Sequence, residues 1–166
     1  MTSLTIETPV GPFTMVGRGK TILASGFTDD VPGLVNLIHP YLRNAADADG
    51  DLEPIAESVE AYFDGDLAAI DTVDVEQHAG GRFLDHAWDT LRTVPAGTPV
   101  TYTALAELAG RPAAVRAAAM ACARNAAALF VPCHRIIRTD GSLGGFRWGL
   151  DVKRWLLGHE QAAAGN

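Results

Sequence analysis

The sequence predicts a mixed α/β (α+β) protein made of a small N-terminal α/β domain followed by a mostly helical C-terminal domain. Residues 1–27 hold three short β-rich runs separated by turn residues, whereas helical spacing of apolar residues dominates from residue 80 onward. Charge divides the chain at the same place: residues 1–78 carry 14 acidic and 3 basic side chains, and residues 79–166 carry 6 and 10. We therefore expect two domains, 1–78 and 79–166.

The N-terminal part reads as a meander of short antiparallel strands followed by helices. Proline- and glycine-bearing turns separate the strands, which we expect at Leu4–Ile6, Phe13–Val16 and Ile22–Phe27. Apolar spacing predicts helices over Val31–Leu42 and Pro54–Phe63, the second with proline in its first turn. Residues 64–81 show no clear periodicity and form the expected connector.

The C-terminal part contains a helix-turn-helix pattern. One helix is expected around Phe83–Leu91, a short one over Tyr102–Leu108, and a third from Ala113 to about Arg124 after the Gly110 turn. The third helix is narrow because it holds seven alanines, with Arg116 the one long side chain in its middle turns. Such a helix can press its backbone against a partner, but alanine is also simply the best helix former.

Basic residues concentrate in this second part. Between positions 111 and 154 there are eight Lys or Arg residues and only two acidic residues. This distribution favours a polyanionic partner such as DNA, despite the overall charge of −7. An acidic, solvated first half beside an average second half is the other explanation.

The run Pro132-Cys133-His134-Arg135 indicates a reactive cysteine in a stiff turn. Proline fixes φ, and a neighbouring histidine or arginine favours the thiolate, which is the nucleophilic form. Two cysteines make no disulfide framework, so we expect a reducing, cytoplasmic compartment. No apolar run approaches the roughly 20 residues that span a bilayer, and the N-terminus has no secretory pattern. Cys122, Cys133 and His134 lack paired metal-ligand spacing, so neither a metal nor a cofactor is expected.

A longer constellation of motifs runs through the second half in a fixed order. It consists of Val94-Pro95-Ala96-Gly97, Thr101-Tyr102, Arg116-Ala117, Asn125, Pro132-Cys133-His134-Arg135-Ile136-Ile137, Gly141-Ser142-Leu143-Gly144-Gly145-Phe146 and Lys153…Leu156-Leu157…Glu160. The constellation resembles the methylated-DNA–protein-cysteine methyltransferases, which repair 6-O-alkylguanine in DNA. The phrases Ala121-Cys122-Ala123 and Phe146-Arg147-Trp148-Gly149 look most like the methyltransferase half of the bacterial adaptive-response protein.

The resemblance implies a ribonuclease H-like N-terminal domain, a winged-helix-like C-terminal domain and a set of catalytic roles. Cys133 would accept the alkyl group in a single, irreversible turnover. His134 would act as its base through a water, and Glu160 would orient His134. Asn125 would form a hinge between the third helix and the cysteine turn. Tyr102 would help to rotate the lesion out and would protonate, or hydrogen-bond to, the departing guanine.

The same resemblance implies that the partner is double-stranded DNA containing 6-O-alkylguanine. We expect the protein to act as a monomer and not to associate with a membrane. Arg116 would fill the space left by the extruded base. The other expected DNA contacts are Ala114, Ala117, Arg124 and Arg135, and the expected pocket residues are Cys122, Ile136, Phe146, Arg147 and Trp148. Trp148 would narrow the pocket mouth and favour methyl over benzyl groups.

Three other functions compete with repair. An alkyltransferase-like module would bind lesions without repairing them, but that group lacks the acceptor thiol. A helix-turn-helix regulator would have to sense damage through Cys133 itself. A cysteine hydrolase would need an oxyanion hole and a route for water, neither of which is visible in the sequence.

Overall fold

The chain folds into two compact units in a computed structural model that describes residues 1–78 and 80–165. The first unit comprises Met1–His78 together with Ala126–Phe130, and the second comprises Ala79–Asn125 and Val131–Asn166. Residues 126–130 therefore belong to the first unit and not to the C-terminal part in which the sequence predicts them.

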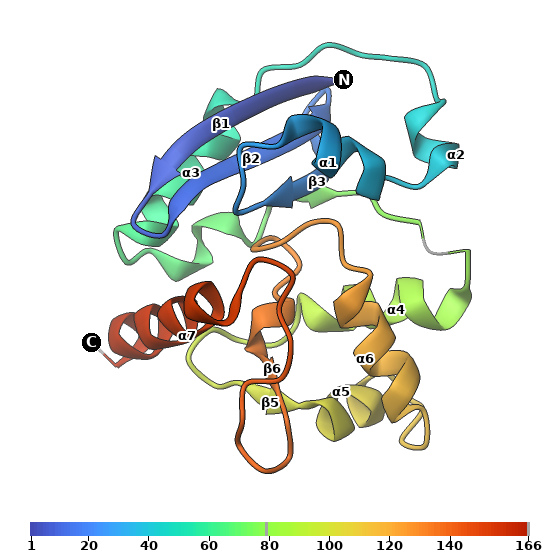
Figure 1. Cartoon of the computed structure of the whole chain (residues 1–166), viewed down its shortest axis with the longest axis vertical. Coiled ribbons are helices and arrows are strands. Elements are labelled where there is room, and N and C mark those ends of the chain that lie inside the picture. The colour runs from blue at the N-terminus through green and yellow to red at the C-terminus, as the bar shows by residue number, and fades with distance from the viewer. Residues whose placement is uncertain (79, 166) are drawn as a thin grey trace. The chain divides into compact units, whose positions relative to one another are not determined.

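The first unit is built on a four-stranded sheet with the order β1 (Thr2–Thr8), β2 (Gly11–Arg18), β3 (Thr21–Gly26) and β4 (Asp74–Val75) (Figure 1). The first three strands pair antiparallel, with Leu4 opposite Met15 and Val16 opposite Ala24. The predicted meander is therefore confirmed. β4 pairs parallel to β3 at the edge, and its two residues gave no strand signal of their own.

Short helices complete this unit: α1 (Val31–Leu37), α2 (Pro40–Arg43), α3 (Glu53–Phe63) and the 3-10 helix η1 (Leu67–Ile70). The single helix predicted over Val31–Leu42 is wrong. Ile38 is extended, and Pro40 restarts the chain as α2, because proline disfavours a helical residue before it. α3 contacts β1 and α1 contacts β2 and β3, burying Phe13, Met15 and Tyr62 completely.

Residues 126–130 join the first unit by pairing with β3. The backbone N–H of Ser25 donates to the carbonyl of Ala126 at 2.8 Å, and the N–H of Ala128 donates to the carbonyl of Ser25 at 3.2 Å. The Ser25 hydroxyl donates to the carbonyl of Ala128 at 2.8 Å. The segment that precedes the cysteine turn in sequence is thus fixed as an extension of a sheet.

The second unit contains α4 (Arg82–Leu91), α5 (Tyr102–Leu108), α6 (Val115–Ala123) and α7 (Leu150–Ala164). β5 (Val100–Thr101) pairs parallel with β6 (Ile136–Ile137), which follows the 3-10 helix η2 (Cys133–Arg135). α5 has the predicted bounds, while α6 begins two residues later than expected because residues 112 and 113 form a turn. Within residues 1–78 and 80–165, no helix combines the length and apolarity needed to cross a membrane.

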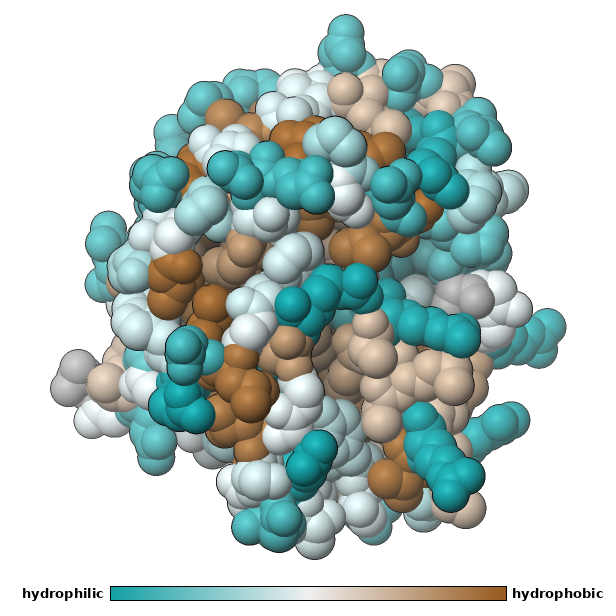
Figure 2. Space-filling model, in the orientation of Figure 1, coloured by the Kyte–Doolittle hydropathy of each residue, from teal (hydrophilic) through white to brown (hydrophobic). Residues whose placement is uncertain are grey.

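Contacts among α4, α5 and α6 hold the helix-turn-helix together. The indole N–H of Trp88 on α4 donates to the carbonyl of Ala121 on α6 at 2.8 Å. The small side chains of Ala118 and Ala121 are fully buried, which lets the helices approach closely. Over α6 the surface of Figure 2 is pale and weakly apolar, with strongly hydrophilic side chains around it.

Candidate active site

A cavity of about 430 Å³ lies within the second unit and contains both cysteines. Its wall is formed by α6 together with the residues that precede α7. The lining residues are Tyr102, Ala119, Cys122, Ala123, Asn125, Cys133, Gly145, Phe146, Arg147 and Trp148. The volume falls within the range of small-molecule pockets.

Cys133 opens η2 and is held from two directions. Its backbone N–H donates to the carbonyl of Val131 at 2.8 Å. The side-chain amide of Asn125 donates to Cys133 Sγ at 3.3 Å and to the carbonyl of Val131 at 2.8 Å. One amide group therefore connects the end of α6 to both the backbone and the thiol of the cysteine turn.

Burial raises the pKa of the Cys133 thiol, so the resting form is the protonated thiol. The hydrogen bond from Asn125 and the positive charges of Lys153 and Arg147 act in the opposite direction. From the sequence, we expect His134 and Arg135 to favour the thiolate in this way. That expectation is wrong, because Arg135 is committed to a buried carboxylate and burial lowers the pKa of His134.

That carboxylate belongs to Glu160, which lies on the buried face of α7 and binds both residues that follow the cysteine. His134 Nε2 lies 2.8 Å from Oε2 of Glu160. Arg135 donates from Nε to Oε1 and from Nη2 to Oε2, each at 2.9 Å. Nη1 of Arg135 donates to the carbonyl of Val94 at 2.8 Å. This pairing is the bidentate geometry in which arginine and carboxylate interact most strongly.

The charges of this cluster fix the tautomer of His134. Burial alone would raise the pKa of Glu160, but the contacts with His134 and Arg135 more than offset it and hold that pKa well below its ordinary value. An ionised carboxylate only accepts hydrogen bonds, so His134 Nε2 must carry the proton. In the neutral imidazole, Nδ1 is then the basic atom. Nδ1 is buried and has no hydrogen-bond partner among the described residues.

Lys153 is a buried cation that the sequence analysis left without a role. Its ammonium donates to the carbonyls of Ile136 at 2.7 Å, Leu143 at 2.5 Å and Gly145 at 3.3 Å. These bonds tie α7 to β6 and to the loop that forms part of the cavity wall. A signal was available: Lys153 and Glu160 fall on the same face of the helix as Leu156, which is fully buried.

Two contacts shape the rest of the pocket. Gly144 has φ +73°, and a Cβ atom at this position would lie 2.8 Å from the Tyr102 hydroxyl, so an alanine here would be strained and would press against the tyrosine. Arg147 donates from Nη2 to the carbonyl of Ala123 at 2.7 Å and thereby joins the loop to the end of α6. Burial raises the pKa of Tyr102, which stays protonated and able to donate.

The structure brings most of the expected catalytic and pocket residues together, with two corrections. Arg135, expected at the DNA surface, is 4% exposed and fully engaged by Glu160 and Val94. Ile136, expected in the pocket, does not line the cavity; its side chain is buried in β6. Sequence reasoning had not placed Ala119, Ala123 and Gly145 in the cavity wall.

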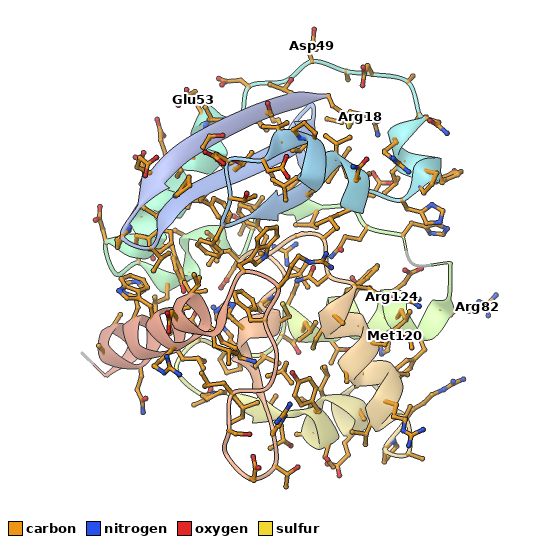
Figure 3. All side chains as sticks on the ribbon, viewed as in Figure 1. Arg18, Asp49, Glu53, Arg82, Met120 and Arg124 are labelled. Carbon is orange, nitrogen blue, oxygen red and sulfur yellow. The ribbon has the colours of Figure 1, made fainter. Side chains whose placement is uncertain are left out.

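The remaining residues expected to contact DNA lie on or beside α6. Arg116 and Arg124 are exposed, and Ala114 and Ala117 are partly exposed. Figure 3 labels Arg124 at the C-terminal end of this helix. Across residues 1–78 and 80–165, no group of three or more His, Cys, Asp or Glu side chains is arranged to hold a metal ion.

Residues 82–162 match the family model described as 6-O-methylguanine DNA methyltransferase, DNA binding domain. A methylated-DNA–protein-cysteine methyltransferase of Salmonella typhimurium is 36% identical over 162 residues, covering 93% of this chain and 92% of the relative. The bifunctional transcriptional activator/DNA repair enzyme Ada of Escherichia coli is 37% identical over 135 residues. That match covers 80% of this chain, which spans only 37% of Ada.

Solved structures show the same fold. Mycobacterium tuberculosis OGT in complex with DNA superposes with a TM-score of 0.77 at 29% sequence identity. The alignment covers 97% of this chain and 93% of that structure. A mixed α/β protein with a small antiparallel sheet and a helical C-terminal part is therefore confirmed as the fold class.

Proposed function

The chain belongs to the methylated-DNA–protein-cysteine methyltransferase family, and from this premise we propose that it transfers the alkyl group of 6-O-alkylguanine in duplex DNA to Cys133. The observation that carries the proposal is the thiol of Cys133, which lines the cavity and accepts a hydrogen bond from Asn125, directly followed in the chain by His134, which is paired with Glu160. An alkyltransferase-like binding module would not need the thiol, and a regulator would not need a pocket the size of a base.

The reaction begins with proton removal from Cys133. Because burial keeps this thiol protonated, a base must act before it can attack. Nδ1 of His134 accepts the proton through one bridging water, and the carboxylate of Glu160 stabilises the imidazolium that forms. Asn125 and the positive charges of Lys153 and Arg147 stabilise the thiolate during this transfer.

The thiolate sulfur then attacks the alkyl carbon from the side opposite the guanine oxygen. A C–S bond forms as the C–O bond breaks, and the electron pair of the C–O bond goes to guanine. Tyr102, whose raised pKa keeps its hydroxyl protonated, donates a hydrogen bond or a proton to the departing base. The thioether product has no good leaving group, so each molecule repairs one lesion and is consumed.

The lesion must leave the base stack to reach the cavity, and α6 supplies the means. Arg116 occupies the space that the extruded guanine vacates, which offsets part of the unstacking cost of a few kcal/mol. Ala114 and Ala117 allow close approach to the minor groove, and Arg124 contacts the DNA backbone. We place this reaction in the cytoplasm and assign it to a monomer.

One experiment tests this function directly. The protein is incubated with a duplex oligonucleotide carrying labelled 6-O-methylguanine, and the label is located by mass spectrometry. We expect one label per protein molecule, on Cys133, and none in the Cys133→Ser variant. Cys122→Ser is the matched control, because Cys122 lines the same cavity but its thiol lacks the hydrogen bond from Asn125. Transfer of more than one equivalent, or labelling of Cys122 in the native protein, would refute the proposal.

A further inference from the structure

One exposed face of α6, continued by its C-terminal cap residue Arg124, carries three long side chains in a row. Arg116, Met120 and Arg124 follow one another at four-residue spacing and are all exposed. Residues four apart lie on the same side of a helix, about 6 Å apart along its axis. The stripe Arg116–Met120–Arg124 therefore runs about 12 Å along α6.

Met120 is the unusual member of this stripe. Its side chain is 43% exposed, whereas most large apolar side chains in the described chain are buried. Arginines stand one turn away on each side of it, and the helix between them is mostly alanine. Figure 3 labels Met120 and Arg124 along α6. The stripe thus presents a flexible apolar side chain between two exposed positive charges.

The stripe borders the active-site cavity. Ala119 and Cys122 on α6 line that cavity. Arg116 lies three residues before Ala119 and is its neighbour on the helix surface. Met120 is one turn beyond Arg116. Around the helix axis, Arg116 therefore lies next to the cavity-lining residues, and Met120 lies next to Arg116 on the side away from the cavity.

A duplex groove has the chemistry that matches this stripe. Phosphates line the two rims of the minor groove, and deoxyriboses and base edges form its less polar floor. The groove is about 6 Å wide and an α-helix with its side chains is about 10–12 Å across, so the helix stays at the rims. Alanine side chains let it lie close to those rims while a single long side chain enters. Minor-groove proteins insert apolar side chains, methionine among them, between base steps and hold the duplex open. A purely apolar protein groove would leave both arginines unpaired.

We propose that Met120 is a wedge that enters the minor groove beside the extruded guanine, with Arg124 on a phosphate at the groove rim. The proposal rests on the repair function argued above and assigns to Met120 a positioning role in base extrusion. Met120 touches neither the thiol nor the alkyl group. Its contribution is to bury its side chain against sugars and base edges that become accessible only when the duplex opens.

The test compares repair of a duplex with reaction of a free base. Met120→Ala should lower the rate of methyl transfer from duplex 6-O-methylguanine by about tenfold, the equivalent of exposing most of a methionine side chain. The rate with free 6-O-methylguanine should stay at the native value, because the cavity is unchanged. Met120→Leu, which keeps an apolar side chain of similar volume, should remain within about threefold of the native protein on duplex.

Salt dependence separates the wedge from its charged neighbour. Met120→Ala should weaken binding to the duplex without changing the slope of log K against log salt concentration, because no counterion is released by an apolar contact. Arg124→Ala should reduce the magnitude of that slope by about 0.9, the value for one phosphate. Binding is measured by fluorescence anisotropy on the same oligonucleotide over a range of salt concentrations.

Leu108→Ala is the matched control, since Leu108 is 57% exposed but lies on α5. It should bind and repair duplex like the native protein. If Met120→Ala binds and repairs the duplex as well as the native protein does, the proposed role of Met120 is wrong. It is also wrong if Leu108→Ala loses as much duplex binding and repair as Met120→Ala. If the native protein transfers no methyl group to Cys133 from either substrate, the repair function fails. The anisotropy series then still decides whether Met120 contacts DNA.

Discussion

The imidazole of His134 and the carboxylate of Glu160 meet at 2.8 Å, Nε2 to Oε2, with both side chains fully buried. Glu160 is also the bidentate acceptor for Arg135, so one carboxylate orients the histidine and neutralises the arginine. The cysteine turn is therefore anchored to α7 through both residues that follow the thiol. Acid–base chemistry and the fold of the turn depend on the same side chain.

Replacing the Glu160 carboxylate by an amide tests whether the acid–base chemistry and the fold of the cysteine turn both depend on it. Glu160→Gln should slow methyl transfer on the order of 10²–10⁴-fold, since the imidazolium loses its counter-charge and the tautomer is no longer fixed. Breaking the buried ion pair should also lower the free energy of unfolding by about 3–5 kcal/mol. Single-turnover kinetics and urea unfolding measure the two effects. Glu107→Gln, on an exposed position of α5, should change neither. A folded Glu160→Gln protein that repairs at the native rate would reduce Glu160 to a structural role.

Local signals predicted the elements of the fold but not their long-range partners. α5 and the antiparallel strands were predictable because turn residues and apolar spacing act within a few positions. Residues 126–130 pair with Ser25, about a hundred positions away, and nothing in their own composition indicates that partner. The prediction of one continuous helix over residues 31–42 was wrong because Pro40 interrupts the helix despite the apolar spacing around it.

The site divides in the same way. The cysteine turn depends on residues that are adjacent in the chain, so the cysteine and its neighbours were enough to predict it. The fate of Arg135 depends on Glu160, 25 positions later in the chain, and a surface arginine and a buried one look alike in sequence. Lys153 was predictable in principle, because a cation on the buried face of a helix needs acceptors. What the sequence could not supply is that those acceptors are the carbonyls of the pocket loop.

The pH dependence of stability below neutral pH follows from two buried groups, His134 and Glu160. The folded protein holds the pKa of His134 below its ordinary value of 6.5, mainly through burial, so the unfolded chain binds the proton more readily. Stability should therefore begin to fall as the pH drops below about 6.5. The pKa of Glu160 is also depressed, so a second loss should set in below its ordinary value of 4.5.

Urea unfolding from pH 8 to pH 4 measures this dependence. In His134→Gln the loss between pH 6.5 and 5 should become smaller than in the native protein, because the glutamine does not titrate. A native protein with constant stability across that interval would show that His134 is not held neutral.

The three carbonyl bonds of Lys153 predict a specific loss of the pocket loop. Lys153→Met keeps the length of the side chain but leaves the carbonyls of Ile136, Leu143 and Gly145 without their donor. Unfolding free energy should fall by about 2–4 kcal/mol, and methyl transfer should slow at least about tenfold because the loop no longer holds the thiolate-stabilising charges. Arg154→Met is the matched control, since Arg154 is exposed and paired with the exposed Asp151 at 3.1 Å. Equal losses of stability and of methyl-transfer rate in the two variants would show that Lys153 does not hold the pocket loop.

Trp148 predicts the size of alkyl group that the cavity accepts. Its indole lines the pocket, so methyl lesions should be repaired much faster than benzyl lesions. Trp148→Gly should raise the benzyl-to-methyl rate ratio by about tenfold or more, whereas Trp148→Phe should change it less. Competition between 6-O-methyl- and 6-O-benzylguanine measures the ratio. Equal native rates on the two substrates would show that Trp148 does not restrict the pocket.

Gly144 lies against Tyr102 and Gly141 does not, so alanine substitutions at the two positions can isolate the role of Tyr102. Both have positive φ, +73° and +86°, so alanine at either position should cost about 1–2 kcal/mol of stability through backbone strain. Only at Gly144 would the new Cβ meet a side chain, the Tyr102 hydroxyl at 2.8 Å. Gly144→Ala should therefore displace Tyr102 and slow methyl transfer, whereas Gly141→Ala should lose stability alone.

Adding Tyr102→Phe completes the comparison. If the alanine acts by displacing the hydroxyl, Gly144→Ala should slow the Tyr102→Phe protein much less than it slows the native one, giving a clear coupling in a double-mutant cycle. Single-turnover rates at a temperature where all four proteins are folded supply the cycle. Strictly additive effects would mean that Gly144 acts through the loop backbone and not through the tyrosine, because an unlinked strain would slow both backgrounds by the same factor.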